Sequence, residues 1–112
     1  MDWVEAKGAR VVPLIQGEPE NVTLEKLAKV NGVLFPGGDG DYLDYGRFVF
    51  NAVRKINDEG TYLPLWGTCM GYENMVSYIS DDGWNVLSVY DMDSASLTLD
   101  FVVDPEETKL YE

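Results

Sequence analysis

The sequence predicts an α/β domain with three layers, in which helices cover both faces of a mostly parallel central sheet. Short apolar runs alternate along the chain with helical patterns, and such alternation is typical of βαβ units with right-handed crossovers. The apolar runs are continuous, as expected for strands that are buried on both faces. Glycine-rich turns follow two of these runs, at the strand ends where parallel sheets bind ligands. With 112 residues the chain is one domain at most.

The N-terminal third predicts helix, strand and helix. Asp2–Gly8 resembles the last turns of a helix, with Gly8 at the position that ends it. Arg10–Ile15 is a short apolar strand, although Pro13 cannot donate a ladder hydrogen bond. After a polar turn, Thr23 can cap a short helix. The apolar residues that share one face of this helix are Leu24, Leu27 and Ala28.

The middle of the chain predicts two further strands around a long helix. Val33–Phe35 is a strand that runs into the glycine-rich loop Pro36–Gly40, and Tyr62–Trp66 is the next strand. Between them Leu43–Asp58 has apolar residues at spacings of three and four, which predicts one buried helical face. These residues are Tyr45, Phe48, Val49, Ala52, Val53 and Ile56.

A sharp turn with a cysteine follows the strand at 62–66. Gly67-Thr68-Cys69-Met70-Gly71 is the cysteine form of the nucleophile elbow, in which small flanking residues permit a tight turn between strand and helix. Cys69 then lies at a helix N-terminus, where unpaired N–H groups favour the thiolate. A buried structural cysteine is the alternative. The helix after the turn has one apolar side, formed by Tyr72, Met75, Val76 and Ile79.

The pattern changes after Gly83. Trp84–Tyr90 and Leu97–Val103 are predicted strands, either a hairpin or the start of a further part of the sheet, with Asp91–Ser96 between them.

Composition excludes several functions. The net charge of −12 argues against nucleic acids and anionic membranes as partners, since both attract basic patches. A single cysteine excludes an internal disulfide, and no apolar run has the length of a membrane span. The sequence predicts neither a metal site nor a cofactor.

Three segments together resemble the γ-glutamyl hydrolase family, the folate-polyglutamate peptidases of the class I glutamine amidotransferase-like fold. They are Trp3–Pro13, Asn31–Gly38 and Leu65–Glu73, in unbroken order. The resemblance runs from about Trp3 to Val103. It implies hydrolysis of a small poly-γ-glutamyl substrate by a cysteine nucleophile.

The resemblance also assigns roles to individual residues. Cys69 matches the nucleophile that attacks the γ-glutamyl amide carbon, and the N–H groups of Gly38 and Met70 match the oxyanion hole. Gly37 matches the residue that shapes the loop, and Glu73 matches an acidic residue near the bound glutamate. Amidotransferases more often carry glutamine at this last position, so Glu73 favours the hydrolase branch. A different elbow-cysteine enzyme, such as a glutaminase domain, is the weaker alternative.

The general base of such a mechanism is absent from the sequence, which contains no histidine. In the family the histidine lies beyond residue 112, and a strand of the central sheet precedes the first helix. Residues 1–112 therefore correspond to the N-terminal to central part of a γ-glutamyl-hydrolase-like domain, without its first strand and its C-terminal part. We expect the chain alone to be inactive.

Three further expectations concern a non-catalytic role, the assembly and the cellular location. The chain could instead be a truncated or degenerate relative that serves as a non-catalytic structural or binding subunit, and it could form a homodimer or join a larger assembly. Asn21-Val22-Thr23 is an N-glycosylation sequon. Members of the family that the chain resembles are lysosomal, vacuolar or secreted. Together with this resemblance, the sequon suggests a glycoprotein in one of these locations.

Overall fold

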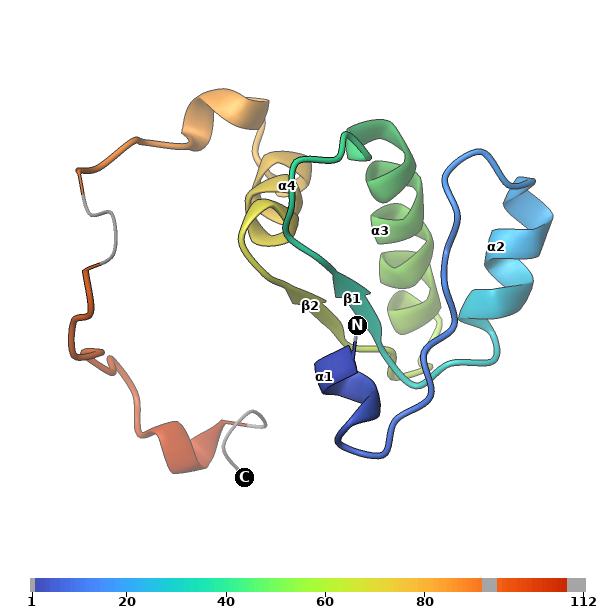
Figure 1. Ribbon diagram of the computed structural model, residues 1–112, viewed down its shortest axis with the longest axis horizontal. Helices are drawn as coiled ribbons and strands as arrows, with labels where there is room; N and C mark the ends of the chain where they lie inside the picture. Colours follow the sequence, from blue (N-terminus) through green and yellow to red (C-terminus); the bar gives the residue numbers. More distant parts are fainter. Residues whose placement is uncertain (1, 92–94, 109–112) are drawn as a thin grey trace.

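In the computed structural model of the protein, which describes residues 2–91 and 95–108, helices and strands alternate from α2 to α4 (Figure 1). The elements in chain order are α1 (Asp2–Glu5), α2 (Glu20–Leu27), β1 (Val33–Phe35), α3 (Leu43–Asp58), β2 (Leu65–Gly67) and α4 (Met70–Ile79). Two short 3₁₀ turns follow, at Gly83–Val86 and Pro105–Glu107.

The two strands of the described residues form a parallel sheet, which confirms an α/β fold with parallel pairing. Val33 pairs with Leu65, and Phe35 pairs with Gly67. The ladder extends past both ends of β2, because Pro64 O accepts from Val33 N at 2.9 Å and Thr68 N donates to Phe35 O at 3.0 Å. The pairing therefore brings the segments after Phe35 and after Gly67 to the same edge of the sheet.

The strand predicted at 62–66 begins later than expected, at Leu65. The side-chain amide of Asn57 explains the difference. Its Oδ1 accepts from Leu63 N at 3.0 Å, and its Nδ2 donates to Leu63 O at 2.8 Å. Both backbone groups of Leu63 are thus bound to the end of α3 rather than to a strand.

The core lies between the sheet and helix α3, whose range is the one predicted. Its buried apolar residues are Leu27, Val33, Phe35, Val49, Phe50, Val53 and Leu63. All six apolar positions predicted for the α3 face are buried or half-buried, so this prediction is confirmed. Burial of each large apolar side chain contributes roughly 1.5–3 kcal/mol.

Helix α4 packs on the same side of the sheet as α3. The Tyr78 ring lies 5.5 Å from the Phe50 ring and 6.5 Å from the Phe35 ring. The predicted apolar side of α4 is confirmed in part, because Met75 and Val76 are half-buried while Tyr72 and Ile79 are exposed. The buried residues of α4 are Gly71, Asn74 and Ser77. Small residues are needed here because α4 approaches the backbone of β1 closely.

Helix α2 is present, but Thr23 does not cap it as predicted. The helix begins at Glu20 after Pro19, so Thr23 lies inside it. Its side chain is fully buried, and its hydroxyl hydrogen-bonds the carboxylate of Glu18 and the hydroxyl of Tyr45. The predicted apolar face is also wrong in part, because only Leu27 of the three residues is buried.

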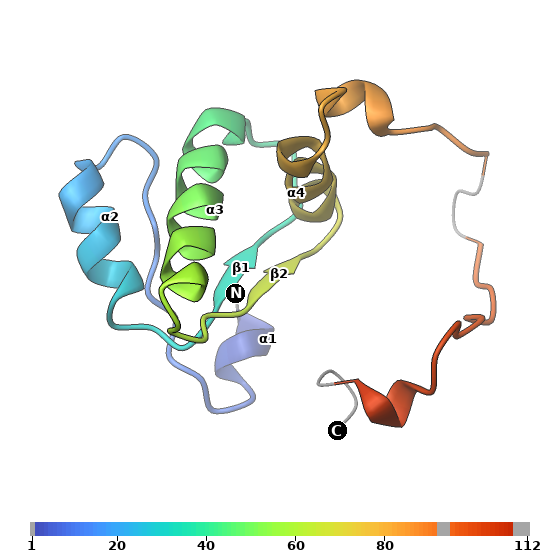
Figure 2. The same ribbon diagram turned by 180° about the vertical axis from the view of Figure 1, so that it is seen from behind.

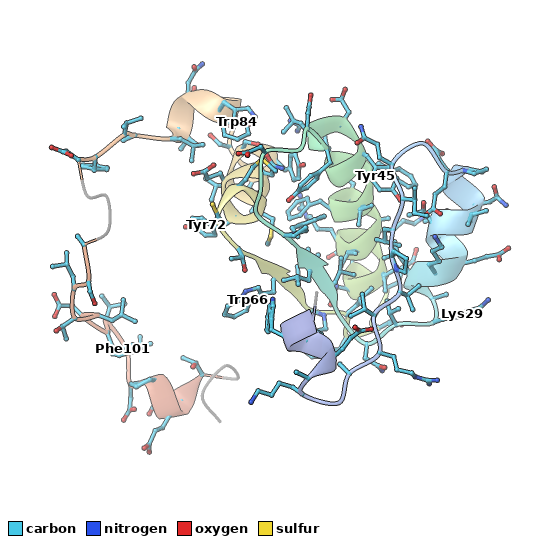
Figure 3. The ribbon with its side chains drawn as sticks, viewed as in Figure 1. Lys29, Tyr45, Trp66, Tyr72, Trp84 and Phe101 are labelled. Atoms are coloured by element: carbon cyan, nitrogen blue, oxygen red, sulfur yellow. The ribbon has the colours of Figure 1, made fainter. Side chains whose placement is uncertain are left out.

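The strand predicted at Arg10–Ile15 is absent: this segment is extended but pairs with no strand in the described residues. Pro13 has no N–H, and its carbonyl accepts from Lys26 Nζ at 2.9 Å. A groove of about 1010 Å³ separates the segment from β1. Its walls include Val12, Leu34 and Trp66, and Trp66 projects from β2 away from α3 (Figure 3).

The two strands predicted after Gly83 are also absent. Gly83–Val86 is a 3₁₀ turn, and the described residues from 87 to 104 contain no helix or strand. Figures 1 and 2 show the described parts of this segment running away from the helices and the sheet. The intervening Asp91–Ser96 lies partly outside the described residues. None of the helices in the described ranges has both the length and the apolar character needed to cross a bilayer.

Candidate active site

Cys69 occupies the sharp turn between β2 and α4. Its backbone has φ 54° and ψ −123°, and it is the one non-glycine residue with positive φ in the described ranges. Such a conformation is uncommon for a residue with a Cβ atom and is typical of functional turns. The side chain is exposed, so the alternative of a buried structural cysteine is wrong.

The two glycines that flank this turn are required by close backbone approach. A Cβ atom at Gly67 would lie 2.8 Å from the backbone nitrogen of Tyr72. A Cβ atom at Gly71 would lie 2.1 Å from Phe35 O, a backbone atom of the neighbouring strand. No side chain fits at either position, and the strand-to-helix turn therefore depends on both glycines.

The glycine-rich loop after β1 lies against Cys69. A Cβ atom at Gly37 would lie 2.8 Å from Cys69 Cβ and 3.5 Å from its Sγ. Gly38 has φ +128°, a conformation that favours glycine. The parallel pairing of β1 and β2 thus brings Gly37 and Cys69 together from 32 residues apart.

The N–H groups of Gly38 and Met70 have no hydrogen-bond acceptor within the described residues. Met70 opens α4, and the first helical bonds come from the next residues: Gly71 N donates to Thr68 O, and Tyr72 N donates to Cys69 O. Free N–H groups beside a nucleophile can stabilise an oxyanion. Glu73 lies in the first turn of α4, four residues after Cys69, with a half-buried side chain.

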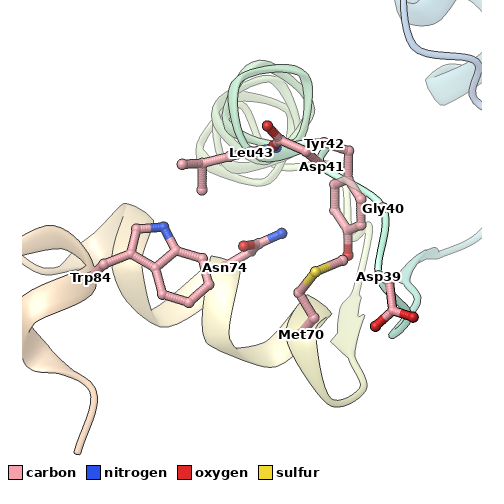
Figure 4. A pocket seen from close by; sticks show the side chains of 8 residues that line it. All are labelled: Asp39, Gly40, Asp41, Tyr42, Leu43, Met70, Asn74 and Trp84. Atoms are coloured by element: carbon pink, nitrogen blue, oxygen red, sulfur yellow. The ribbon is translucent and has the colours of Figure 1, made fainter.

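A pocket of about 320 Å³ lies next to this turn (Figure 4). It is lined by Asp39, Gly40, Asp41, Tyr42, Leu43, Met70, Asn74 and Trp84. Met70 is the one predicted site residue among them. Figure 4 shows the Asn74 amide between the Trp84 indole and the Tyr42 ring. The pocket combines two carboxylates, an amide and two aromatic rings.

Tyr42 and Tyr78, near the pocket, each donate a hydrogen bond from a neutral hydroxyl to a backbone carbonyl. Burial raises the pKa of Tyr78 to about 12, and its hydroxyl donates to Leu43 O at 2.8 Å. Burial also raises the pKa of Tyr42, against the opposing effect of a hydrogen bond with Asn74. The Tyr42 hydroxyl donates to Pro36 O at 2.6 Å.

Tyr42, Asn74 and Trp84 line the pocket but are not predicted as site residues from the sequence. Asn74 gave one signal that could have been used, since it is a polar residue one turn after Met70 in a mostly apolar helix. Trp84 gave none, because its position depends on the 3₁₀ turn that follows α4. In the described ranges no three His, Cys, Asp or Glu side chains are grouped closely enough to hold a metal ion.

The fold and this turn define the class of protein: an α/β protein with a cysteine elbow between a parallel strand and a helix. Curated relatives with similar sequences share one name. The chain is 39% identical to γ-glutamyl hydrolase 1 of Arabidopsis thaliana, over 89% of the chain and 29% of that protein. It is 33% identical to γ-glutamyl hydrolase B of Dictyostelium discoideum, over 98% of the chain and 33% of that protein. It is 34% identical to γ-glutamyl hydrolase of Bos taurus, over 98% of the chain and 36% of that protein.

The chain belongs to the γ-glutamyl hydrolase family, which confirms the resemblance drawn from its three motifs. It spans about a third of the length of these relatives. No protein-family model matches the chain, and no solved structure does.

Proposed function

We propose that the protein, over its complete length, hydrolyses γ-glutamyl bonds in a small poly-γ-glutamyl substrate such as a folate poly-γ-glutamate. The observation that carries the proposal is the strained backbone of Cys69, which holds an exposed thiol between β2 and α4. The names of the relatives support the same activity.

The proposed reaction proceeds through a thioester. The Cys69 thiolate attacks the amide carbonyl carbon, and the oxyanion that forms accepts hydrogen bonds from the N–H groups of Gly38 and Met70. The C–N bond then breaks, and the amine leaves with a proton supplied by a general acid. Water hydrolyses the thioester and restores the thiol. Gly37 keeps the loop close to the sulfur, and Glu73 contacts the bound glutamate.

The general base must come from outside these 112 residues, since they contain no histidine. We propose that a histidine of the remaining protein serves this role, in a three-layer domain of the class I glutamine amidotransferase-like fold. The remaining protein would also extend the parallel sheet beyond the two strands β1 and β2. The 320 Å³ pocket is the proposed site for the part of the substrate next to the scissile bond.

The cellular setting is part of the proposal. A lysosomal, vacuolar or secreted location agrees with the sequon at Asn21, whose side chain is exposed. Because Thr23 of the sequon is buried inside α2, a glycan would have to be attached before this helix packs. A homodimer, or a place as a subunit of a larger assembly, is the proposed quaternary state.

The test is an assay of the complete protein with a poly-γ-glutamyl folate, measuring released glutamate. We expect turnover in the wild type and a loss of at least about 1000-fold in kcat for Cys69→Ala and Cys69→Ser. The control variant Lys55→Ala changes an exposed side chain on α3 and should keep full activity. The 112-residue chain alone should give no turnover.

Two results would contradict the proposal. Turnover that persists in Cys69→Ala would remove the cysteine from the mechanism. A folded complete protein without turnover would favour the second candidate, a non-catalytic structural or binding subunit. The absence of histidine from these residues is the observation that favours that candidate.

A further inference from the structure

We propose that Tyr42 is a positioning residue for the proposed oxyanion site, because its hydroxyl holds the Pro36–Gly40 loop, which carries the Gly38 N–H and lies against Cys69 at Gly37. This inference rests on the proposed function and names a residue that acts through the loop rather than on the substrate.

The loop has one hydrogen-bonded anchor. Its first residue follows Phe35, whose carbonyl still belongs to the sheet and accepts from Thr68 N at 3.0 Å. From Pro36 to Gly40, within the described residues, the bond from Tyr42 Oη to Pro36 O at 2.6 Å is the one hydrogen bond that the loop makes. A loop with two adjacent glycines has wide conformational freedom, so this bond restricts the conformations that the loop populates.

Tyr42 is itself held firmly. Its ring stacks on that of Phe35 with centroids 6.2 Å apart and planes 25° apart. A Cβ atom at Gly46 would lie 3.0 Å from the Tyr42 ring, so the first turn of α3 also packs against this ring. Asn74 of α4, which is 2% exposed, interacts with the Tyr42 side chain and partly offsets the effect of burial on the Tyr42 pKa. The hydroxyl is therefore positioned by β1, α3 and α4 together.

The position of the loop matters because Gly37 already touches Cys69. A Cβ atom at position 37 would lie 2.8 Å from Cys69 Cβ, so only glycine permits this close approach. A small shift of Pro36 therefore changes the direction of the next N–H groups relative to the sulfur. Removal of one oxyanion donor costs about 10²–10³-fold in rate. Loosening a donor without removing it should cost less, about 5- to 20-fold.

The experiment compares two reactions of Cys69 in the same chain. With 4-nitrophenyl acetate, the thiolate attacks the ester carbonyl, an oxyanion develops, and 4-nitrophenolate leaves to give an acetyl thioester. With iodoacetamide, the thiolate displaces iodide in one step and no oxyanion develops. Both reactions use the thiolate, so the ratio of the two rates isolates the contribution of the oxyanion donors.

Tyr42→Phe removes the hydroxyl and keeps the stacked ring. We expect its acetylation rate to fall about 5- to 20-fold while its alkylation rate stays within about twofold of wild type. Tyr45→Phe is the matched control, because the Tyr45 hydroxyl bonds Thr23 and Glu18 away from the loop. Both of its rates should be unchanged. A Tyr42→Phe ratio equal to that of wild type would overturn the inference.

A second variant keeps the test decisive if Tyr42→Phe unfolds. Replacing Tyr42 by 3,5-difluorotyrosine nearly preserves size and gives a phenol more acidic than that of tyrosine, whose ionisation can be followed by its ultraviolet absorbance. The rate ratio should match wild type while this phenol is protonated and should fall as it ionises and ceases to donate. A flat ratio across that titration would overturn the inference. A wild-type ratio equal to that of free N-acetylcysteine would instead contradict the oxyanion site of the proposed function.

Discussion

Cys69 can adopt its positive φ because the residues around it leave room for the turn. Gly67 lies against the backbone of Tyr72, and Gly71 lies against the carbonyl of Phe35. Because of these two contacts, the start of α4 packs closely against the end of β1. The free energy of this packing offsets the conformational cost of the positive φ at Cys69.

Gly71→Ala tests this balance. In an exposed helix, alanine would stabilise the protein by about 1 kcal/mol relative to glycine. Here its Cβ would lie 2.1 Å from Phe35 O, and helix α4 would have to move. We expect the free energy of unfolding to fall by about 3 kcal/mol, measured by urea denaturation.

Gly40→Ala is the control for that substitution, because no atom lies within 4 Å of its Cβ position and its φ is not positive. Its stability should stay within about 0.5 kcal/mol of wild type. A Gly71→Ala protein as stable as Gly40→Ala would show that the close approach of α4 and β1 is wrong.

At the level of elements, helix α2 is attached to α3 through Glu18. The Glu18 carboxylate accepts from Lys26 Nζ and lies 3.1 Å from the hydroxyls of both Thr23 and Tyr45. It also accepts from Ile15 N at 3.2 Å, which ties the extended N-terminal segment to the same group. One carboxylate thus connects three parts of the chain.

This connection should depend on pH. The hydrogen bond from Lys26, followed by those from Ile15, Thr23 and Tyr45, outweighs burial and lowers the pKa of Glu18 from 4.5 to about 2. A carboxyl with a lowered folded pKa contributes stability that is present above its unfolded pKa and is lost as the pH falls through the folded value. We expect the free energy of unfolding to decrease between pH 4.5 and about 2 in wild type.

The comparison that checks this is urea denaturation of Glu18→Gln across the same pH range. This variant should be less stable than wild type at pH 6 and should lose less stability on acidification. Glu25→Gln changes an exposed carboxylate of α2 and should follow the wild-type profile. Parallel profiles for wild type and Glu18→Gln would count against the role of Glu18.

The elements also differ in how well the sequence predicts them. The helix at 43–58 was predicted to the residue, because its apolar spacing and its terminal Glu59-Gly60 are local signals. The strands at 10–15, 84–90 and 97–103 were not found, because a strand exists only where another strand pairs with it. The Gly67–Gly71 turn was likewise predictable from local sequence, whereas Tyr42, Asn74 and Trp84 meet only after three separate segments pack together.

In the molecule as a whole, much apolar surface remains exposed. The groove between the 10–15 segment and β1 leaves Trp66 50% exposed and Trp3 63% exposed. Along the C-terminal segment Val89 and Val102 are almost fully exposed. Apolar patches of this kind bind other apolar molecules.

This surface leads to a spectroscopic prediction. The dye 8-anilinonaphthalene-1-sulfonate should bind in the groove and accept excitation energy from Trp3 and Trp66. Trp66→Phe should reduce the tryptophan-sensitised dye emission at saturating dye by about half, since one of two nearby donors is removed. Trp84→Phe is the matched control, because Trp84 lines the other pocket, and it should cause a smaller loss. Equal losses in the two variants would contradict binding in the groove.

The register of β1 and β2 has a consequence for insertions and deletions in this protein. Phe35 pairs with Gly67, and the two halves of the candidate site leave the sheet directly after this pair. Each residue of a strand advances about 3.3 Å, and a shift by one also turns every side chain to the opposite face. A single added residue in either strand would therefore separate Gly37 from Cys69. Added residues in the exposed turn at 59–62 leave that spacing intact, so natural length variation should concentrate there.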